Sequence, residues 1–213
     1  MIGIVDYGMG NLHSVSKAME RIGLPYLISE EIEELAKTDG LLLPGVGAFP
    51  DAMEILNETG KSEFLKQWAA EGKPLMGICL GMQLLFEESE EHRQTKGLGL
   101  LPGKVTKFTG VTSEGASYKI PHMGWNQLQF HKDHAILQEV DAGYVYFVHS
   151  YAVQTEDEDI LVATSDYHQD VPAIVGRGSV VGTQFHPEKS SQVGMELLKN
   201  FGRLVEKGVK QFD

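Results

Sequence analysis

The sequence predicts an α/β protein with a doubly wound, mostly parallel open sheet, helices on both faces and antiparallel additions in the second half. Two observations support this class. In the first hundred residues, short apolar runs alternate with amphipathic helical segments, as in a parallel sheet covered on both faces. Beyond them, strand-like segments follow one another with little helix between them, which favours antiparallel pairing.

The elements of the first half alternate regularly. Asn11 is a suitable cap for the first helix, whose apolar positions recur with helical spacing. The predicted strands cover residues 2–5, 25–28, 40–43 and the run that ends at Cys79. The predicted helices are the segment after Asn11, a segment broken at Gly60, and residues 82–86.

The second half is rich in strand-like segments. They cover residues 104–108, 125–130, 144–148, 160–164, 173–175 and 180–181. A last amphipathic helix carries Val193, Leu197, Phe201, Leu204 and Val205 on its apolar face. Because no repeat, linker or low-complexity segment interrupts the chain, we expect residues 1–213 to form a single domain.

Composition narrows the class of protein further. The chain has 213 residues, one cysteine and a formal net charge of −12. One cysteine allows no internal disulfide, and no apolar run approaches the ~20 residues of a membrane helix. The N-terminus lacks the basic and apolar regions of a signal peptide, so we expect a cytoplasmic protein. Without a basic stripe, nucleic-acid binding is disfavoured.

The only cysteine lies in a pattern typical of a nucleophile. Residues 77–83 read Gly-Ile-Cys-Leu-Gly-Met-Gln, an apolar strand that ends in Gly-x-Cys-x-Gly before a helix. This is the arrangement of a nucleophile elbow, in which a sharp turn exposes the side chain and a helix N-terminus favours the thiolate. The alternative is a small buried apolar residue, as free cysteines often are. The flanking glycines favour the nucleophile.

A base and its orienting group are predicted near the other end of the chain. His186, Pro187 and Glu188 follow an apolar run. Pro187 disfavours a helix, and in an extended segment His186 and Glu188 point to the same side. The carboxylate can then orient the imidazole, which completes a nucleophile, base and orienter with Cys79. Taken alone, this segment is more typical of a surface turn, and the elbow at Cys79 is what favours the catalytic interpretation.

A glycine loop follows the strand at residues 40–43. Pro44, Gly45, Val46 and Gly47 should emerge at the same edge of the sheet as Cys79, where ligands bind in open α/β sheets. Its exposed N–H groups, with that of Leu80, are candidates for an oxyanion hole. The alternative is a plain glycine turn.

Three further segments have simpler interpretations. Gly8-Met9-Gly10 lacks the third glycine of a dinucleotide fingerprint and indicates an ordinary turn. His131 and His134 lack further metal ligands and indicate a surface loop. Residues 87–91 predict a solvated helix end, from which one carboxylate is free to hold an ammonium group.

These motifs together resemble the class I, or triad-type, glutamine amidotransferases. The elbow and the His-Pro-Glu segment carry the resemblance to the class. More specific matches resemble the members of this family that serve as glutaminase subunits in histidine biosynthesis. They lie at residues 6–11, 43–49, 121–126, 147–151 and 184–190. Position 122, often basic in this family, is His here.

The resemblance implies a role for each matching residue. Cys79 would attack the glutamine side-chain amide, while His186 carries the proton and Glu188 orients it. The implied oxyanion hole consists of Val46, Gly47 and Leu80. The implied substrate-binding residues are Gln83, Glu91, Ser150 and Tyr151. No cofactor or metal is implied.

The resemblance also implies a partner. The ammonia would pass to a separate cyclase subunit with a (β/α)₈ barrel, and the two chains would form a heterodimer. The implied interface residues are Asn11, Met123, Trp125, Asn126 and Lys189. Core packing is the alternative role for Trp125.

Two other functions stay open on the sequence alone. The same scaffold could serve an amidotransferase of another pathway or a γ-glutamyl hydrolase, which copurification with a cyclase would distinguish. A non-catalytic binding module is the second, and the intact Cys79, His186 and Glu188 argue against it.

Overall fold

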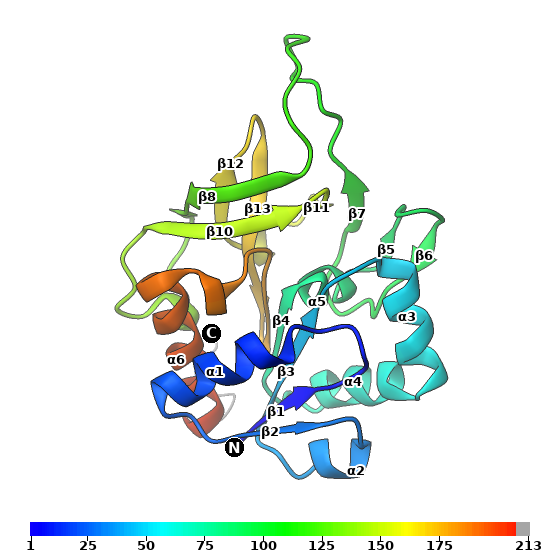
Figure 1. Cartoon of the computed structure of the whole chain (residues 1–213), viewed down its shortest axis with the longest axis vertical. Helices are drawn as coiled ribbons and strands as arrows, with labels where there is room; N and C mark the ends of the chain where they lie inside the picture. The colour runs from blue at the N-terminus through cyan, green and yellow to red at the C-terminus, as the bar shows by residue number, and fades with distance from the viewer. Residues whose placement is uncertain (208–213) are drawn as a thin grey trace.

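The computed structural model describes residues 1–207 and contains an eight-stranded sheet (Figure 1). Its strands are β1 (Ile2–Val5), β2 (Tyr26–Ser29), β3 (Gly40–Gly45), β4 (Leu75–Cys79), β9 (Gln129–Phe130), β12 (Leu161–Asp166), β13 (Asp170–Arg177) and β14 (Val180–Thr183). Their order is β2-β1-β3-β4-β14-β13-β12-β9. The pairings from β2 to β14 are parallel and those from β14 to β9 are antiparallel. The predicted fold class is confirmed.

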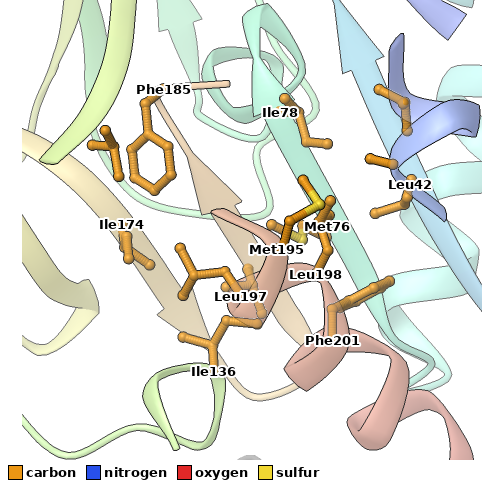
Figure 2. Close-up of a cluster of buried hydrophobic side chains, with 14 of the residues drawn as sticks. Leu42, Met76, Ile78, Ile136, Ile174, Phe185, Met195, Leu197, Leu198 and Phe201 are labelled. Atoms are coloured by element: carbon orange, nitrogen blue, oxygen red, sulfur yellow. The ribbon is translucent and has the colours of Figure 1, made fainter. Parts of the chain in front are cut away.

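Helices cover both faces of this sheet because its strands are apolar on both sides. In β3, Leu42 packs in one hydrophobic cluster, whereas Leu41 and Leu43 pack in the other. The first cluster includes residues of α1 (Leu12–Ile22) and α6 (Ser191–Lys207), and Figure 2 shows its side chains between strands and α6. The second includes residues of α2 (Ile32–Leu35), α3 (Phe49–Glu58), α4 (Lys61–Ala70) and α5 (Leu80–Leu84).

The first helix begins as predicted. The Asn11 side-chain oxygen accepts a hydrogen bond from the Ser14 N–H at 3.2 Å, and Gly23 ends the helix in the left-handed region. The short helix α2 was not predicted. Among residues 1–207, no helix is both long enough and apolar enough to cross a membrane.

The other strands form two smaller antiparallel or mixed sheets. One pairs β8 (His122–Gln127) with β10 (Tyr144–His149), and Figure 1 shows this ribbon crossing β12 and β13 of the large sheet. The other has the order β11-β7-β5-β6, with β5 (Glu88–Ser89), β6 (Thr95–Lys96), β7 (Lys104–Lys107) and β11 (Tyr151–Gln154). Short 3-10 helices lie at η1 (Ala135–Leu137), η2 (Glu158–Ile160) and η3 (Pro187–Lys189).

Two predictions about these segments are wrong. The single strand expected at 125–130 is split at Leu128, which is buried in the core while β8 and β9 join different sheets. The expected helix end at 87–91 is absent because α5 stops at Leu84. The carbonyl groups at the end of α5 accept hydrogen bonds from a later loop instead of continuing the helix. The Leu98 N–H donates to the Leu84 carbonyl, and the Leu100 N–H donates to the Leu85 carbonyl.

Candidate active site

Cys79 lies at a sharp corner between β4 and α5. Its backbone has φ 56° and ψ −113°, a strained conformation for a residue with a side chain. The corner also brings backbones very close together. A Cβ at Gly81 would lie 1.8 Å from the Leu43 carbonyl oxygen, so only glycine fits there. The strand, turn and helix therefore have the geometry expected of a nucleophile elbow.

His186 and Glu188 form a buried pair. The His186 Nδ1–H donates to Glu188 Oε1 at 2.8 Å, and both side chains are almost fully buried. The predicted pairing is confirmed, and His186 itself has the predicted extended backbone, but the prediction that Pro187 excludes a helix is wrong. Residues 187–189 form η3, and Pro187 occupies its first position. A backbone N–H at that position makes no hydrogen bond within the helix, so proline, which has no N–H, is tolerated there.

The surroundings of His186 favour its charged form. Burial lowers its pKa, but the hydrogen bonds to Cys79 and Glu188, with the charges on both, outweigh burial and raise the pKa to about 9. Because Nδ1 is bonded to Glu188, Nε2 is the nitrogen available to Cys79. The arrangement suits a base that takes a proton from a thiol and later returns it.

A pocket of about 400 Å³ opens beside Cys79 and His186. This volume suits a small metabolite. Its wall brings together residues that are far apart in the sequence. The predicted oxyanion residues Val46, Gly47 and Leu80 all line it. The predicted substrate residues Gln83, Glu91, Ser150 and Tyr151 line it too.

The glycine loop at residues 44–47, called the oxyanion loop below, has one backbone N–H that is hydrogen-bonded elsewhere in the protein. The Val46 N–H donates to the Met9 carbonyl at 2.9 Å, in the loop between β1 and α1. Gly47 follows with φ 106°, a conformation that favours glycine. The Val46 N–H is therefore engaged with the protein in this structure and is not available to an oxyanion.

Gln83 and Glu91, which also line the pocket, are held by hydrogen bonds within the protein. The Gln83 amide nitrogen donates to the Tyr151 carbonyl and to Gln184 Oε1, both at 2.9 Å. Glu91 Oε2 accepts a hydrogen bond from the N–H of Phe49, the first residue of α3, at 2.8 Å. Glu91 therefore connects the pocket wall to the segment that follows the glycine loop.

A buried pair of histidines was missed by the sequence analysis. His149 Nδ1 donates to the Tyr151 carbonyl at 2.8 Å, so its Nε2 accepts a hydrogen bond from His122 Nδ1 at 3.0 Å. Burial lowers the pKa of His149 to about 3 and that of His122 to about 4, so both are neutral. They link β8 to the pocket wall. His122, despite the family pattern at this position, is buried rather than a surface charge.

Ser190 was also missed, although its segment was singled out. Its hydroxyl donates to the His186 carbonyl at 2.6 Å and accepts from the Tyr146 N–H at 3.0 Å. The His186 N–H in turn donates to the Tyr146 carbonyl at 3.1 Å. Strand β10 is therefore bonded directly to the backbone of the candidate base.

The predicted interface residues lie on several different elements. Met123 and Trp125 are two residues apart on β8, so their side chains point to the same side of the strand. Met123 is 64% exposed and Trp125 is 53% exposed. Core packing of Trp125 is therefore excluded. Asn126 is half-buried and donates to the Asp166 carbonyl at 2.6 Å. Lys189 is exposed next to the triad, and Asn11 caps α1.

The two histidines considered as metal ligands, His131 and His134, have structural partners. His131 Nε2 is hydrogen-bonded to the Thr164 hydroxyl at 2.7 Å, and His134 Nδ1 accepts from the Ile136 N–H at 3.2 Å. Within the described part of the chain, no group of three or more histidine, cysteine, aspartate or glutamate side chains is arranged to hold a metal ion.

A cysteine elbow with a histidine–carboxylate pair, on an open α/β sheet, defines a cysteine hydrolase of the triad type. Comparisons with known proteins agree. Residues 3–204 match the family Glutamine amidotransferase class-I. A solved structure titled "Crystal structure of glutamine amidotransferase" superposes with a TM-score of 0.76 at 20% identity, over 96% of this chain and 98% of that one. The structure of PurLQS from Thermotoga maritima superposes with a TM-score of 0.71 at 19% identity, over 96% of this chain and 98% of that one.

Relatives in sequence are more specific. The imidazole glycerol phosphate synthase subunit HisH of Halalkalibacterium halodurans is 66% identical over 99% of both chains. The subunit of the same name from Bacillus subtilis is 52% identical over 99% of this chain and 100% of its own. The chain belongs to the class I glutamine amidotransferases and, within them, to the HisH family.

Proposed function

We propose that this chain hydrolyses glutamine to glutamate and ammonia. The ammonia passes to a separate (β/α)₈ cyclase subunit that makes imidazole glycerol phosphate and aminoimidazole carboxamide ribotide in histidine biosynthesis. The observation that carries the proposal is the buried His186–Glu188 pair beside the elbow of Cys79, in a pocket of small-metabolite size. The HisH relatives favour this pathway over others that use the same class of enzyme.

The first half of the reaction releases ammonia. The proton of the Cys79 thiol passes to His186 Nε2, and the sulfur then attacks the side-chain carbonyl carbon of glutamine. The negative oxygen of the tetrahedral intermediate is stabilised by N–H groups of the oxyanion loop and of Leu80. The C–N bond then breaks, His186 returns the proton to the leaving nitrogen, and ammonia departs from a thioester on Cys79.

The second half regenerates the enzyme. His186 takes a proton from water, which attacks the thioester carbonyl. The C–S bond breaks, the proton returns to the Cys79 sulfur, and glutamate leaves. Gln83, Glu91 and the backbone of Ser150 and Tyr151 hold the amino-acid end of the substrate throughout. A reduced thiol is required, which agrees with a cytoplasmic location. We treat residues 1–213 as one catalytic domain.

We further propose that the oxyanion hole is incomplete until the cyclase docks. In its present position the Val46 N–H serves the Met9 carbonyl. A turn of the Gly45–Val46 peptide would direct that N–H into the pocket. The loss of one oxyanion donor typically lowers the rate by ~10²–10³. Differential contact of the cyclase with the two loop states would provide the coupling.

Glutamate release tests this function under three conditions: the chain alone, with cyclase, and with cyclase and its ligand. We expect a very low rate alone and an increase of about 10²-fold or more on activation. The Cys79→Ala variant should release no glutamate, yet its complex should still use free ammonia. Equal rates in the three conditions would contradict the gated oxyanion hole, and glutamate release by Cys79→Ala would contradict the triad.

A further inference from the structure

Tyr7 has a buried hydroxyl group that the mechanism above does not use. The residue follows β1 and is only 5% exposed. Among residues 1–207, its hydroxyl oxygen has no hydrogen-bond partner. A buried hydroxyl without a partner destabilises the state that contains it, because the hydrogen bonds it made to water are not replaced. Such a group in an active site therefore requires an explanation.

The hydroxyl lies directly against the oxyanion loop. A Cβ built on Gly45 would be 2.7 Å from the Tyr7 oxygen and 2.9 Å from both the Gly81 nitrogen and the Leu80 Cβ. Burial raises the pKa of Tyr7, and the nearby Cys79 raises it further, so the group stays a neutral O–H donor. An unpaired donor therefore contacts Gly45 at the base of the oxyanion hole.

A turn of the Gly45–Val46 peptide would direct a new hydrogen-bond acceptor, the Gly45 carbonyl, toward the loop that contains Tyr7. The N–H and C=O of one peptide point in opposite directions. The Val46 N–H now points at the Met9 carbonyl, so the Gly45 carbonyl points away from it. After the turn, the Gly45 carbonyl would face the loop between β1 and α1. The Met9 carbonyl there is also an acceptor and cannot pair with it, whereas Tyr7 carries a free donor.

We propose that Tyr7 is a positioning residue whose hydroxyl donates to the Gly45 carbonyl only when the oxyanion loop is in its active arrangement. The inference rests on the gated oxyanion hole proposed above. The hydroxyl is unpaired in the resting state and paired in the active state. Tyr7 therefore shifts the equilibrium of the loop toward the active arrangement without touching the substrate.

The Tyr7→Phe variant tests this role because it removes only the hydroxyl. In the complex with cyclase and its ligand, we expect kcat for glutamine hydrolysis to fall about tenfold, as for the loss of one hydrogen bond. KM for glutamine and turnover with free ammonia should stay unchanged. The isolated variant should be at least as stable to heat as the wild type, because its resting state loses an unpaired polar group.

Tyr26→Phe is a matched control, since the Tyr26 hydroxyl donates to Glu20 Oε1 at 2.9 Å on the surface. It should leave kcat unchanged. An unaltered kcat in Tyr7→Phe, with normal activation of the wild type, would overturn the role of Tyr7 and leave the gate intact. A fall in both kcat and thermal stability would also overturn it, because the hydroxyl would then have a resting partner. A wild type without activation would overturn the gate itself.

Discussion

At the scale of single residues, the charge of His186 depends on its two neighbours. The folded protein holds a proton on this imidazole more tightly than the unfolded chain does, since contacts with Cys79 and Glu188 overcome burial and raise its pKa from 6.5 to about 9. This linkage stabilises the fold fully below pH 6.5, and the stabilisation is lost as the pH rises toward 9. The contacts with Cys79 and Glu188 that prepare His186 to act as a base therefore also make the stability of the fold depend on pH.

Replacing Glu188 with Gln should weaken this linkage. The amide keeps the shape of the side chain but removes the charge that helps to raise the His186 pKa. We expect the free energy of unfolding of Glu188→Gln to fall less than that of the wild type between pH 6.5 and pH 9. Urea unfolding at both pH values measures this difference. Identical pH dependence in the two proteins would mean that Glu188 does not control the protonation of His186.

Individual residues also explain which parts of the site were predictable. Cys79 is recognisable from its local sequence, because the backbones at the elbow approach so closely that only glycine fits at Gly77 and Gly81. His149 and Ser190 have no such local pattern. Their roles depend on contacts with His122 and Tyr146, which only the folded chain brings near.

At the scale of elements, periodicity predicted the parallel strands and the helices that cover them, because burial on two faces produces long apolar runs. The prediction that Pro187 prevents a helix failed at residues 187–189, where proline begins a 3-10 helix. Periodicity failed between β8 and β9, because one predicted strand segment passes from a peripheral ribbon into the main sheet at Leu128. Strand length and composition carry no information about which sheet a strand joins.

The junction of β3, β4 and α5 should be intolerant of larger residues. In Gly81→Ala, the new Cβ would collide with the Leu43 carbonyl, so the backbone must move. Overpacking of this kind typically costs about 1–3 kcal/mol of stability. We also expect slower alkylation of Cys79, because the elbow that presents it is displaced. Thermal unfolding and the rate of thiol labelling measure the two effects.

Gly115→Ala provides the control for this prediction. Gly115 has a positive φ, so the substitution strains the backbone there, but its Cβ would meet open space in a loop outside the site. This variant should leave the labelling rate of Cys79 unchanged. Wild-type labelling in Gly81→Ala would show that the close approach does not set the position of the cysteine.

At the scale of the whole molecule, the exposed ribbon of β8 and β10 is connected to the catalytic residues by short bonded paths. The Tyr146 backbone is bonded to His186 and Ser190, and His122 is bonded to His149 in the pocket wall. Val46, in the oxyanion loop, is itself 41% exposed. A partner on this side would therefore contact elements that hold the base, the substrate wall and the oxyanion loop.

The exposed aromatic on this ribbon gives the last prediction. The Trp125 ring packs edge-on against Tyr146, with centroids 6.1 Å apart, yet it is 53% exposed and lies beside exposed Met123. A large aromatic of this kind is a typical interface anchor, whose loss costs about 2 kcal/mol of binding energy. We expect Trp125→Ala to weaken cyclase binding about 30-fold, at 1.4 kcal/mol per tenfold change. Its melting temperature should hardly change, because little buried area is lost.

Titration calorimetry with the cyclase measures this affinity, and Ile28→Ala is the matched control. Ile28 is 36% exposed on β2, the opposite edge strand of the large sheet, so its truncation removes exposed apolar surface far from the ribbon. Its affinity for the cyclase should equal that of the wild type. If Trp125→Ala folds normally and also binds with wild-type affinity, the cyclase does not dock on β8. The bonded paths from this ribbon to His186 and His149 would then stabilise the site without transmitting the presence of the partner.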